Sequence, residues 1–589
     1  DKNEVIKELE NYKRILDIKI RKYHDIKCEY LVEFGGFFIF RMSADSFPGE
    51  ILTSNMGNEF EVIESREQKD GEGYILELKA LEHINEDEIA RIRSFTKSSN
   101  DAILLNYIER LIKDVKTGNL SPLMSAILGL RKETPLSPED IYVLPDEAYY
   151  NKELLSNEAQ KQAVALACTL DGINNAVEIV QGPPGTGKTT LIKEIALQYY
   201  HAGKNVLILA KTNVAVDNIL EKLIQDKVRV LRTGNNIEFK SDLPYAPAVS
   251  TSSPAYMAML EGKNRIVLGT PLGFYLDRNM EILNYDIVII DEGSQMDIPE
   301  TLFSLSFANK CVIIGDHLQL PPFPIPNEVL LEYNPSIDLY TSEELQKSLF
   351  EKLITDRNRF NSVFLDINYR TENPNMVSFI SDLVYDGRLY PNTDSAYYKV
   401  PRQKRNAMFP LNPIEIIDTS ELLDPRTRSE IEENSTYYNI SEAILSVKKA
   451  AELLEMGEKL EDICIITPYK AQIEKLKELF RENEKYFSSR SSYFMNFIDQ
   501  NIYTIDSFQG KEQENVIINW VRSNYTDSGL YTRTGFLRDY RRVNVALSRA
   551  KKRLILIGDF ATLTRSADMK VQYIFSKIKN VNKNRKIVL

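Results

Sequence analysis

Residues 181–190 combine glycine, lysine and threonine at the spacing of a phosphate-binding loop. The run reads Gln-Gly-Pro-Pro-Gly-Thr-Gly-Lys-Thr-Thr and lies between an apolar segment, 176–180, and a helical pattern. Such glycines let backbone N–H groups turn toward phosphate oxygens, and the following helix N-terminus adds partial positive charge. The Lys188 side chain would reach the β- and γ-phosphates, and the Thr189 hydroxyl would bind Mg²⁺. The predicted nucleotide-binding residues are Gly182, Pro183, Pro184, Gly185, Thr186, Gly187, Lys188, Thr189 and Thr190.

Two acidic residues follow the apolar run 285–290, which we predict to be a strand. An aspartate at the carboxyl end of a strand beside a phosphate-binding loop can hold Mg²⁺, so Asp291 is a predicted metal ligand. The adjacent Glu292 can orient or deprotonate the attacking water. Taken alone, the pair could equally be an acidic strand end that caps the next helix. Beside a phosphate-binding loop, the pair favours nucleotide hydrolysis.

Polar residues also end the next predicted strand, in the run 315–322, Gly-Asp-His-Leu-Gln-Leu-Pro-Pro. Asp316 and Gln319 could sense the γ-phosphate and pass its presence to the domain boundary; the alternative is a turn that the two prolines terminate. A later run, 504–512, joins two predicted strands and could couple the nucleotide to another ligand, with Glu512 as a candidate nucleotide contact. Its alternative is a polar turn that contains a glycine.

Two arginines in the second half of the chain are candidates for contact with the γ-phosphate. Arg370 ends a predicted strand, and Arg549 lies in the small and apolar helical segment 544–550. A guanidinium in such surroundings needs an anionic partner. Both residues could be arginine fingers that reach the γ-phosphate when two domains close. Structural salt bridges are the alternative for each arginine.

The elements that must position these residues form an α/β pattern. Continuous apolar strands with helical crossovers indicate a parallel sheet covered on both faces. The first set of strand candidates is 176–180, 205–210, 265–269, 285–290 and 311–314. The second set is 362–367, 463–466, 502–505, 515–521 and 553–557. Because only the first set has a phosphate-binding loop, we expect one nucleotide in the cleft between two sheet domains.

The domain organisation follows from these patterns. We predict the sheet domains at 151–345 and 346–570, with an irregular insertion near 391–440 that is rich in proline, asparagine and charge. Residues 571–589 are predicted to be a basic, solvated tail, with phosphate contacts as the alternative.

The first part of the chain is predicted to be an accessory region. Residues 1–27 have helical spacing and would form a stalk. Short strands predict a small β-barrel domain at 28–95, with a hairpin at Asp70-Gly71. Residues 96–150 return to helical spacing and form a linker.

Composition excludes several classes of protein. The 589 residues contain no run of about 18 apolar residues, so no membrane span is expected. Four cysteines and four histidines are scattered, which argues against zinc and iron–sulfur sites and fits a reducing cytoplasm, or a nucleus in a eukaryote. The N-terminus does not resemble a signal peptide, so secretion is not expected. It also lacks Met, as a piece of a longer protein would. Because the net charge is −12, nucleic acid would need a local basic groove.

The order of these motifs resembles superfamily 1 helicases, and most closely the Up-frameshift and senataxin-like group of superfamily 1B. The resemblance covers residues 154–560 and begins at Gln160, in a run similar to the family's adenine-reading Q motif. It continues through the runs 182–189, 210–217, 269–270, 291–295, 315–322, 369–370, 467–469, 504–512 and 545–549.

The resemblance implies two RecA-like domains that bind ATP between them and single-stranded nucleic acid, DNA or RNA, across their top. It implies that Gln160 reads adenine and that Tyr369 stacks on it. It assigns phosphate, metal and water chemistry to Lys188, Thr189, Asp291, Glu292, Gln319, Arg370 and Arg549. It places near the strand backbone Thr212, Asn213, Thr270, Thr467 and Ser507. The stalk and the β domain would match the accessory barrel of the family.

The chain departs from the family pattern in places. Lys211-Thr212 stands where relatives often have Pro-Ser, and residues 371–374 differ from the Met-His-Pro that often follows the arginine at 370. The run 315–322 lacks the aromatic residue that superfamily 1A enzymes usually place nearby for stacking. By resemblance, its absence favours superfamily 1B and 5′→3′ movement.

Three functions stay open on the sequence. The first is a motor that unwinds duplexes. The second is an ATP-gated clamp or ribonucleoprotein remodeller. The third is an ATPase module of a larger machine with protein partners or a fused effector domain. DNA and RNA are not distinguished, because the difference lies in contacts to the 2′-hydroxyl.

Overall fold

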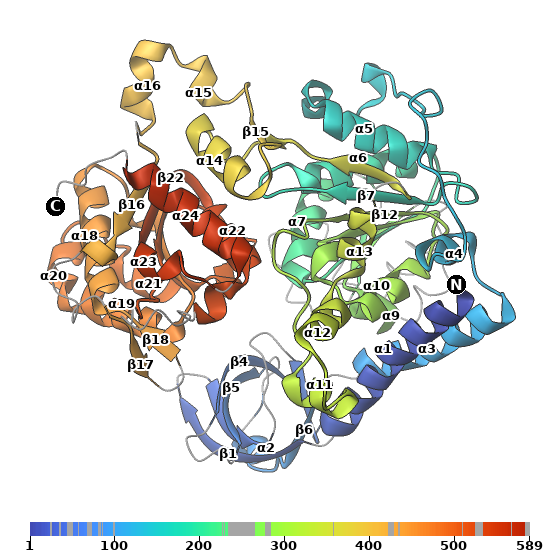
Figure 1. Cartoon of the computed structure of the whole chain (residues 1–589), viewed down its shortest axis with the longest axis horizontal. Coiled ribbons are helices and arrows are strands. Elements are labelled where there is room, and N and C mark those ends of the chain that lie inside the picture. The colour runs from blue at the N-terminus through green and yellow to red at the C-terminus, as the bar shows by residue number, and fades with distance from the viewer. Residues whose placement is uncertain are drawn as a thin grey trace.

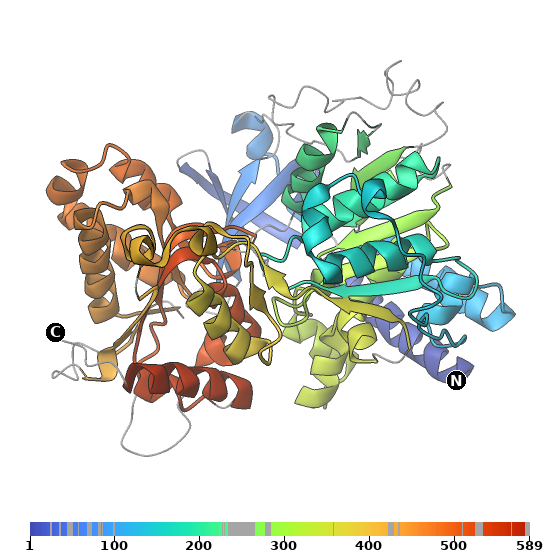
Figure 2. The same cartoon turned by 90° about the horizontal axis from the view of Figure 1, so that it is seen from above.

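A computed structural model shows two α/β units side by side, with a small barrel next to them (Figures 1 and 2). The structure describes residues 1–23, 26–34, 37–43, 51–56, 58–67, 73–80, 84, 86–97, 100–226, 228, 230–233, 265–276, 284–356, 359–410, 412–421, 429–433, 436–508, 510–524, 534–566 and 568–583. The predicted α/β class with two parallel-sheet domains, a helical stalk and an accessory barrel is confirmed.

Seven parallel strands form the first sheet, in the order β13-β7-β12-β11-β8-β10-β9. They are β7 (Val177–Gln181), β8 (Val206–Ala210), β9 (Val230–Arg232), β10 (Ile266–Gly269), β11 (Ile287–Asp291), β12 (Cys311–Gly315) and β13 (Asn361–Phe364). The central strands are buried along their whole length, which explains their continuous apolar sequences. Because the strands run in one direction, the segments after β7, β11 and β12 meet at one edge of the sheet.

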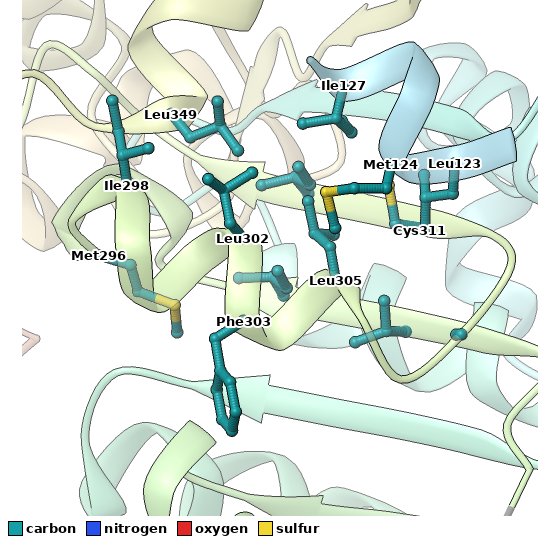
Figure 3. Packing of buried hydrophobic residues seen from close by; sticks show 14 of the residues in the cluster. Leu123, Met124, Ile127, Met296, Ile298, Leu302, Phe303, Leu305, Cys311 and Leu349 are labelled. Carbon is teal, nitrogen blue, oxygen red and sulfur yellow. The ribbon is translucent and has the colours of Figure 1, made fainter. Parts of the chain in front are cut away.

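Helices cover both faces of this sheet. One face packs against α5 (Glu158–Thr169), α6 (Lys188–His201) and α7 (Asn213–Ile224). The other packs against α3 (Asn100–Thr117), α4 (Pro122–Ile127), α9 (Pro271–Leu276), α10 (Ile298–Leu305) and α13 (Leu349–Thr355). Figure 3 shows Leu302 and Leu305 of α10 together with Met124 and Ile127 of α4 in this second core. Each such fully buried side chain stabilises the fold by about 1.5–3 kcal/mol, so the strand ends have a rigid base.

Five parallel strands form the second sheet, in the order β16-β22-β21-β19-β20. They are β16 (Ile414–Asp418), β19 (Ile463–Thr467), β20 (Ile502–Thr504), β21 (Gln513–Asn519) and β22 (Ala550–Gly558). One face carries α14 (Pro374–Val384), α22 (Tyr540–Leu547), α23 (Phe560–Leu563) and α24 (Met569–Lys583). The other carries α18 (Ile440–Glu455), α19 (Lys470–Glu482), α20 (Glu484–Ser488) and α21 (Phe494–Gln500).

The predicted small β domain is a closed barrel with the strand order β1-β2-β5-β4-β3-β6. Its strands are β1 (Ile26–Phe34), β2 (Phe37–Met42), β3 (Ile51–Ser54), β4 (Glu59–Glu67), β5 (Tyr74–Ala80) and β6 (Ser94–Lys97), with α2 (Glu86–Ile89) before β6. The rings of Phe40, Phe60 and Phe95 meet edge to face at its centre. β4 and β5 are antiparallel neighbours, whereas the predicted turn at Asp70-Gly71 lies outside the described residues.

The stalk connects this barrel to the first unit. α1 (Lys2–Tyr23) packs against α3, and it also contacts α11 (Asn327–Tyr333), whose Val329 joins the barrel core. α12 (Leu339–Gln346) follows α11 on the same side (Figure 1). The barrel is therefore held by both the start of the chain and the segment that follows β12.

One strand that we expected in the second sheet belongs to the first. The first half of the apolar run at 362–367 lies in β13, which pairs with β7 so that Asn361 lies opposite Glu178 and Phe364 opposite Gln181. The first sheet thus continues past residue 345. An apolar run indicates that a strand exists, but it does not indicate which sheet edge has unpaired N–H and C=O groups to receive it.

The region predicted as an irregular insertion, 391–440, is partly regular. It contains β16, an edge strand of the second sheet, and the hairpin of β17 (Ile431–Glu433) and β18 (Thr436–Tyr438). Shorter elements precede them: β14 (Ile367–Asn368) pairs with β15 (Tyr390–Pro391), and α15 (Ala396–Lys399) and α16 (Arg402–Met408) follow. Proline- and charge-rich flanks hid these short strands from sequence analysis.

The predicted solvated tail is wrong for most of its length. Its first part belongs to α24, and Val571, Ile574, Phe575 and Ile578 are buried in the core of the second unit. The ring of Phe575 meets the buried ring of Trp520 at a centroid distance of 5.0 Å. The prediction relied on the lysines, which lie on the other face of the helix. It overlooked the apolar residues, which recur at helical spacing.

Candidate functional site

The loop between β7 and α6 has a backbone that requires glycine at two positions. The φ angle is +75° at Gly185 and +82° at Gly187, in the left-handed region. A Cβ atom on Gly185 would lie 2.5 Å from Cβ of Arg370, and one on Gly187 would lie 2.6 Å from Nε2 of Gln160. The glycine spacing thus serves a close approach of neighbouring side chains in addition to the loop conformation.

Lys188 begins α6 and lies among acidic groups. Its Nζ donates to the carbonyl of Gly182 at 2.9 Å. Burial lowers the pKa of Lys188, and the carboxylates of Asp291 and Asp316 oppose that shift. Burial likewise raises the pKa of Asp291, and Lys188 opposes it. The two charges stabilise each other in a poorly hydrated site at the ends of β7 and β11, as phosphate chemistry requires.

Glu292 is held in a strained backbone conformation beside this pair. Its φ of 53° is unusual for a residue other than glycine and costs on the order of 1–3 kcal/mol. The N–H of Glu292 donates to Oδ1 of Asp291 at 2.9 Å. Burial, and secondarily the charge of Asp291, raises the pKa of Glu292 to about 7. A carboxyl with this pKa can accept a proton from water near neutral pH.

Two arginines face the loop from the second unit. Arg370 donates from Nε to Glu512 at 2.6 Å and from Nη1 to the carbonyl of Ser548 at 3.0 Å. Arg549 donates from Nη2 to Oε1 of Gln319 at 3.2 Å. Burial, and then the charge of Arg370, lowers the pKa of Arg549 to about 9. The structure therefore brings together the predicted residues of both units in one place.

The two residues predicted to contact adenine lie on either side of one asparagine. Gln160 donates from Nε2 to the carbonyl of Thr186 at 2.8 Å, and its N–H bonds to Oδ1 of Asn157 at 2.9 Å. The hydroxyl of Tyr369 accepts from Nδ2 of Asn157 at 2.7 Å. Tyr369 is 38% exposed and lines the cleft described below. Asn157 was missed in the sequence, although it is the N-cap of α5.

A buried network that the sequence did not indicate joins the two units. Tyr385 donates to Oδ2 of Asp316 at 2.7 Å and accepts from Nδ2 of Asn544 at 3.0 Å. The same Asn544 nitrogen donates to the carbonyl of Leu318 at 2.7 Å. Gln319 also donates to Asp316 at 2.9 Å. The run 315–322 therefore touches the second unit through Tyr385 and Asn544 as well as through Arg549.

Only some of the residues predicted near a nucleic-acid backbone line the cleft. Thr212 and Ser507 are exposed and line the cleft described below. Asn213 accepts from Arg232 at 2.8 Å, and Thr270 accepts from the N–H of Gly273 at 3.2 Å. Thr467 is buried, whereas its neighbours Pro468 and Tyr469 line the cleft. Their contact with a strand stays a prediction.

A continuous cleft of about 3020 Å³ runs between the units and reaches the barrel. It is lined by the nucleotide-site residues Gln160, Gly185, Thr186, Gly187, Lys188, Thr189, Asp291, Glu292, Gln319, Tyr369, Arg370, Glu512 and Arg549. It is also lined by Phe323, the residue directly after the run 315–322. An aromatic side chain does therefore lie near that run. The prediction of 5′→3′ movement from a missing aromatic residue no longer holds.

The donor set around the loop fits a hard divalent cation. The Asp291 carboxylate and the Thr189 hydroxyl are oxygen donors on the wall of the cleft, which is what Mg²⁺ prefers. Within the described ranges, no three His, Cys, Asp or Glu side chains gather as a metal site, and the lack of zinc and iron–sulfur stays a prediction. Among the helices that the structure describes, none is long and apolar enough to cross a membrane.

Comparisons with known proteins find similar sequences over much of the chain. Two family models, each described as an AAA domain, match residues 155–253 with 248–326 and residues 345–561. The Bos taurus DNA replication ATP-dependent helicase/nuclease DNA2 is 30% identical over 77% of this chain and 43% of that protein. DNA-binding protein SMUBP-2 of Mesocricetus auratus is 27% identical over 78% and 48%. An uncharacterized ATP-dependent helicase of Methanocaldococcus jannaschii is 28% identical over 74% and 71%. The chain thus spans less than half the length of the bovine and hamster relatives.

The geometry of the loop predicts the effect of a Gly187→Ala substitution. We expect nucleotide affinity to fall at least tenfold, because the new Cβ would displace the side chain of Gln160. A tenfold loss of affinity corresponds to a cost of about 1.4 kcal/mol in binding free energy. Gly203→Ala is the matched control, since Gly203 has a φ of +77° and no atom within 4 Å of its Cβ position. Titration with a fluorescent ATP analogue would check both variants. Equal affinity in the two would contradict the role of Gly187.

Proposed function

Because this chain belongs to the Up-frameshift-like group of superfamily 1 helicases, we propose that it hydrolyses ATP to move along single-stranded nucleic acid and to unwind duplexes. The observation that carries the proposal is the cleft in which the loop of one unit faces Arg370 and Arg549 of the other. Thr212 and Ser507 line the same cleft, so nucleotide and strand would share one space.

The charge distribution supports a polyphosphate ligand. Arg549 is only 2% exposed, and its guanidinium contacts carbonyl and amide oxygens rather than a carboxylate. Arg370 lies close enough to lower its pKa further. A γ-phosphate between these cations would compensate a charge whose burial is otherwise unfavourable.

The proposed reaction assigns one task to each group. The backbone of the loop and Lys188 hold the β- and γ-phosphates, and Glu292 accepts a proton from the water that attacks the γ-phosphorus. The bond to the β–γ bridging oxygen breaks, and ADP leaves with that oxygen. Arg370 and Arg549 stabilise the charge that develops on the γ-phosphoryl group. Mg²⁺ held by Thr189 and Asp291 would neutralise phosphate charge.

Loss of the γ-phosphate would weaken the contact between the units. Gln319 and Arg549 lie on opposite sides of the cleft and bond to each other, so both would respond to that phosphate. If each unit holds a strand with different strength in the open and closed states, each cycle moves the protein along it. We propose 5′→3′ movement from family membership, and DNA as the first polymer to test because the bovine and hamster relatives carry it in their names.

The proposal is tested by steady-state ATP hydrolysis without polymer, with single-stranded DNA and with single-stranded RNA at one salt concentration. We expect strong stimulation by at least one polymer, and displacement of the partner strand from a duplex with a 5′ overhang. Stimulation without displacement would favour an ATP-gated clamp. Hydrolysis that neither polymer stimulates would contradict the proposal and favour an ATPase module of a larger protein.

Replacement of Arg549 separates binding from turnover. We expect Arg549→Ala to lower kcat by roughly 10³- to 10⁵-fold with a small change in KM, because the guanidinium acts mainly on transition-state charge. Arg481→Ala, at an exposed position on α19, controls for loss of an arginine elsewhere. Stopped-flow and steady-state kinetics would measure both variants. Normal turnover in Arg549→Ala would remove this residue from the site.

The pKa of Glu292 predicts the pH dependence. Because it is raised to about 7, the carboxyl is protonated and inactive as a base below that pH and ionised above it. We expect kcat to rise with pH through about 7 and then to level off. Glu292→Gln should have a low rate with no such rise. A flat pH profile of the wild-type protein between pH ~5 and ~9 would contradict the assignment of Glu292 as the base.

A further inference from the structure

A basic arm projects from the second half of the chain. It comprises residues 391–410 and contains α15 and α16, which Figure 1 shows at the end of the molecule opposite the barrel. From residue 395 to residue 414, the sequence has four cationic side chains and no aspartate or glutamate. The four are Lys399, Arg402, Lys404 and Arg405. This local excess of positive charge contrasts with the net charge of −12 of the whole chain.

Arg405 holds the two helices of the arm together. Its Nε donates to the carbonyl of Val400 at 3.1 Å, and its guanidinium lies 4.8 Å from the ring centroid of Tyr397. That ring in turn lies 5.3 Å from the ring of Phe409, which follows α16. A guanidinium over an aromatic face is attracted by the electron density of the ring, so these contacts fix α15 and α16 relative to each other. The charge of Arg405 is therefore part of the framework of the arm.

The other three cations of the arm are available to a ligand. Lys399, Arg402 and Lys404 are exposed, and no carboxylate in the described part of the chain forms an ion pair with any of them. Consecutive residues of a helix are rotated by about 100°, so Arg402 and Lys404, two positions apart, lie on nearly opposite sides of α16. The arm thus presents positive charge on two sides of this helix instead of on a single face.

We propose that the arm binds duplex DNA, with α16 in the major groove. The inference rests on the proposed function and adds a second nucleic-acid surface to that of the cleft. A groove has phosphates along both of its walls, so it matches a helix with cations on opposite sides. The major groove of B-form DNA is about 12 Å wide and admits an α-helix, whereas that of A-form RNA is deep and narrow. Because the contacts are to phosphates, binding has no sequence preference.

The arm is separate from the cleft and is attached beside the nucleotide site. Among the described residues that line the cleft, none belongs to the arm. At the start of the arm, the N–H of Asn392 donates to the carbonyl of Asn368 at 3.2 Å, and Nδ2 of Asn368 donates to a carbonyl of the phosphate-binding loop at 2.9 Å. At its end, Nδ2 of Asn373 donates to the carbonyl of Pro410 at 3.2 Å. Because the two surfaces share no residue, a duplex on the arm and a strand in the cleft can be bound at the same time.

The test is fluorescence anisotropy of a labelled, blunt-ended DNA duplex over a series of salt concentrations. The triple variant combines Lys399→Ala, Arg402→Ala and Lys404→Ala. We expect it to bind the duplex roughly tenfold more weakly, or worse, at low salt, because three phosphate contacts are lost. The slope of log affinity against log salt should fall by about 3, which is about one unit for each contact. ATP hydrolysis stimulated by single-stranded DNA should be unchanged, because the cleft keeps all of its lining residues.

Two further variants show whether the place of the charge decides binding. The matched control carries Lys7→Ala, Arg481→Ala and Lys485→Ala, which remove the same charge from exposed positions on α1, α19 and α20. It should bind the duplex as the wild-type protein does. The second variant exchanges the cations of the arm by Lys399→Arg, Arg402→Lys and Lys404→Arg. Because it keeps the charge, it should keep both the affinity and the salt slope.

Three results would overturn the inference. Wild-type duplex affinity in the triple variant of the arm would mean that the arm serves another ligand, such as an acidic segment of a protein. An equal loss in the matched control would mean that the net charge of the protein, and not the arm, holds the duplex. Equal affinity for an RNA duplex of the same sequence would contradict entry into the major groove. Stimulation of ATP hydrolysis by single strands tests the proposed function separately, since it does not depend on the arm.

Discussion

The contact between Arg549 and Gln319 is the interaction on which the proposed cycle depends. It joins the two sheets at a point where Lys188, Asp291 and Glu292 also converge. A guanidinium buried with a second cation nearby is unfavourable unless an anion compensates it. The same arrangement that weakens the protein locally therefore creates affinity for phosphate, and it makes closure of the cleft sensitive to the γ-phosphate.

The surrounding structure positions the contact between Arg549 and Gln319. Tyr385, Asp316 and Asn544 form a buried hydrogen-bond network beside it, and the N–H of Tyr369 donates to the carbonyl of Gly185 at 2.7 Å. These bonds connect the two units directly beside the nucleotide site in the conformation that the structure shows. The strain at Glu292 persists because β11 and the adjacent turn hold its backbone.

The barrel and the β17–β18 hairpin extend the cleft beyond the nucleotide. Glu61 and Ile63 of β4 lie on its wall, and so do Thr436 and Tyr438 of the hairpin. The barrel has an aromatic core of its own, and the ring of Tyr437 holds the hairpin to Tyr469 of the second unit. A long ligand in the cleft could therefore contact the barrel, the hairpin and both units.

The sequence by itself indicated the candidate chemistry and most strands of the sheets. The phosphate loop, Asp291-Glu292 and the two arginines could be identified because each function needs particular residue types at a fixed spacing, and buried parallel strands read as apolar runs. Only the tertiary structure decided that β13 joins the first sheet, that β16 lies within the supposed insertion, and that α24 is packed rather than solvated. It also decided the partners of Tyr385 and the presence of Phe323 in the cleft. The physical reason is that edge pairing, burial and contacts between distant segments depend on which surfaces meet in space, and local spacing does not encode that.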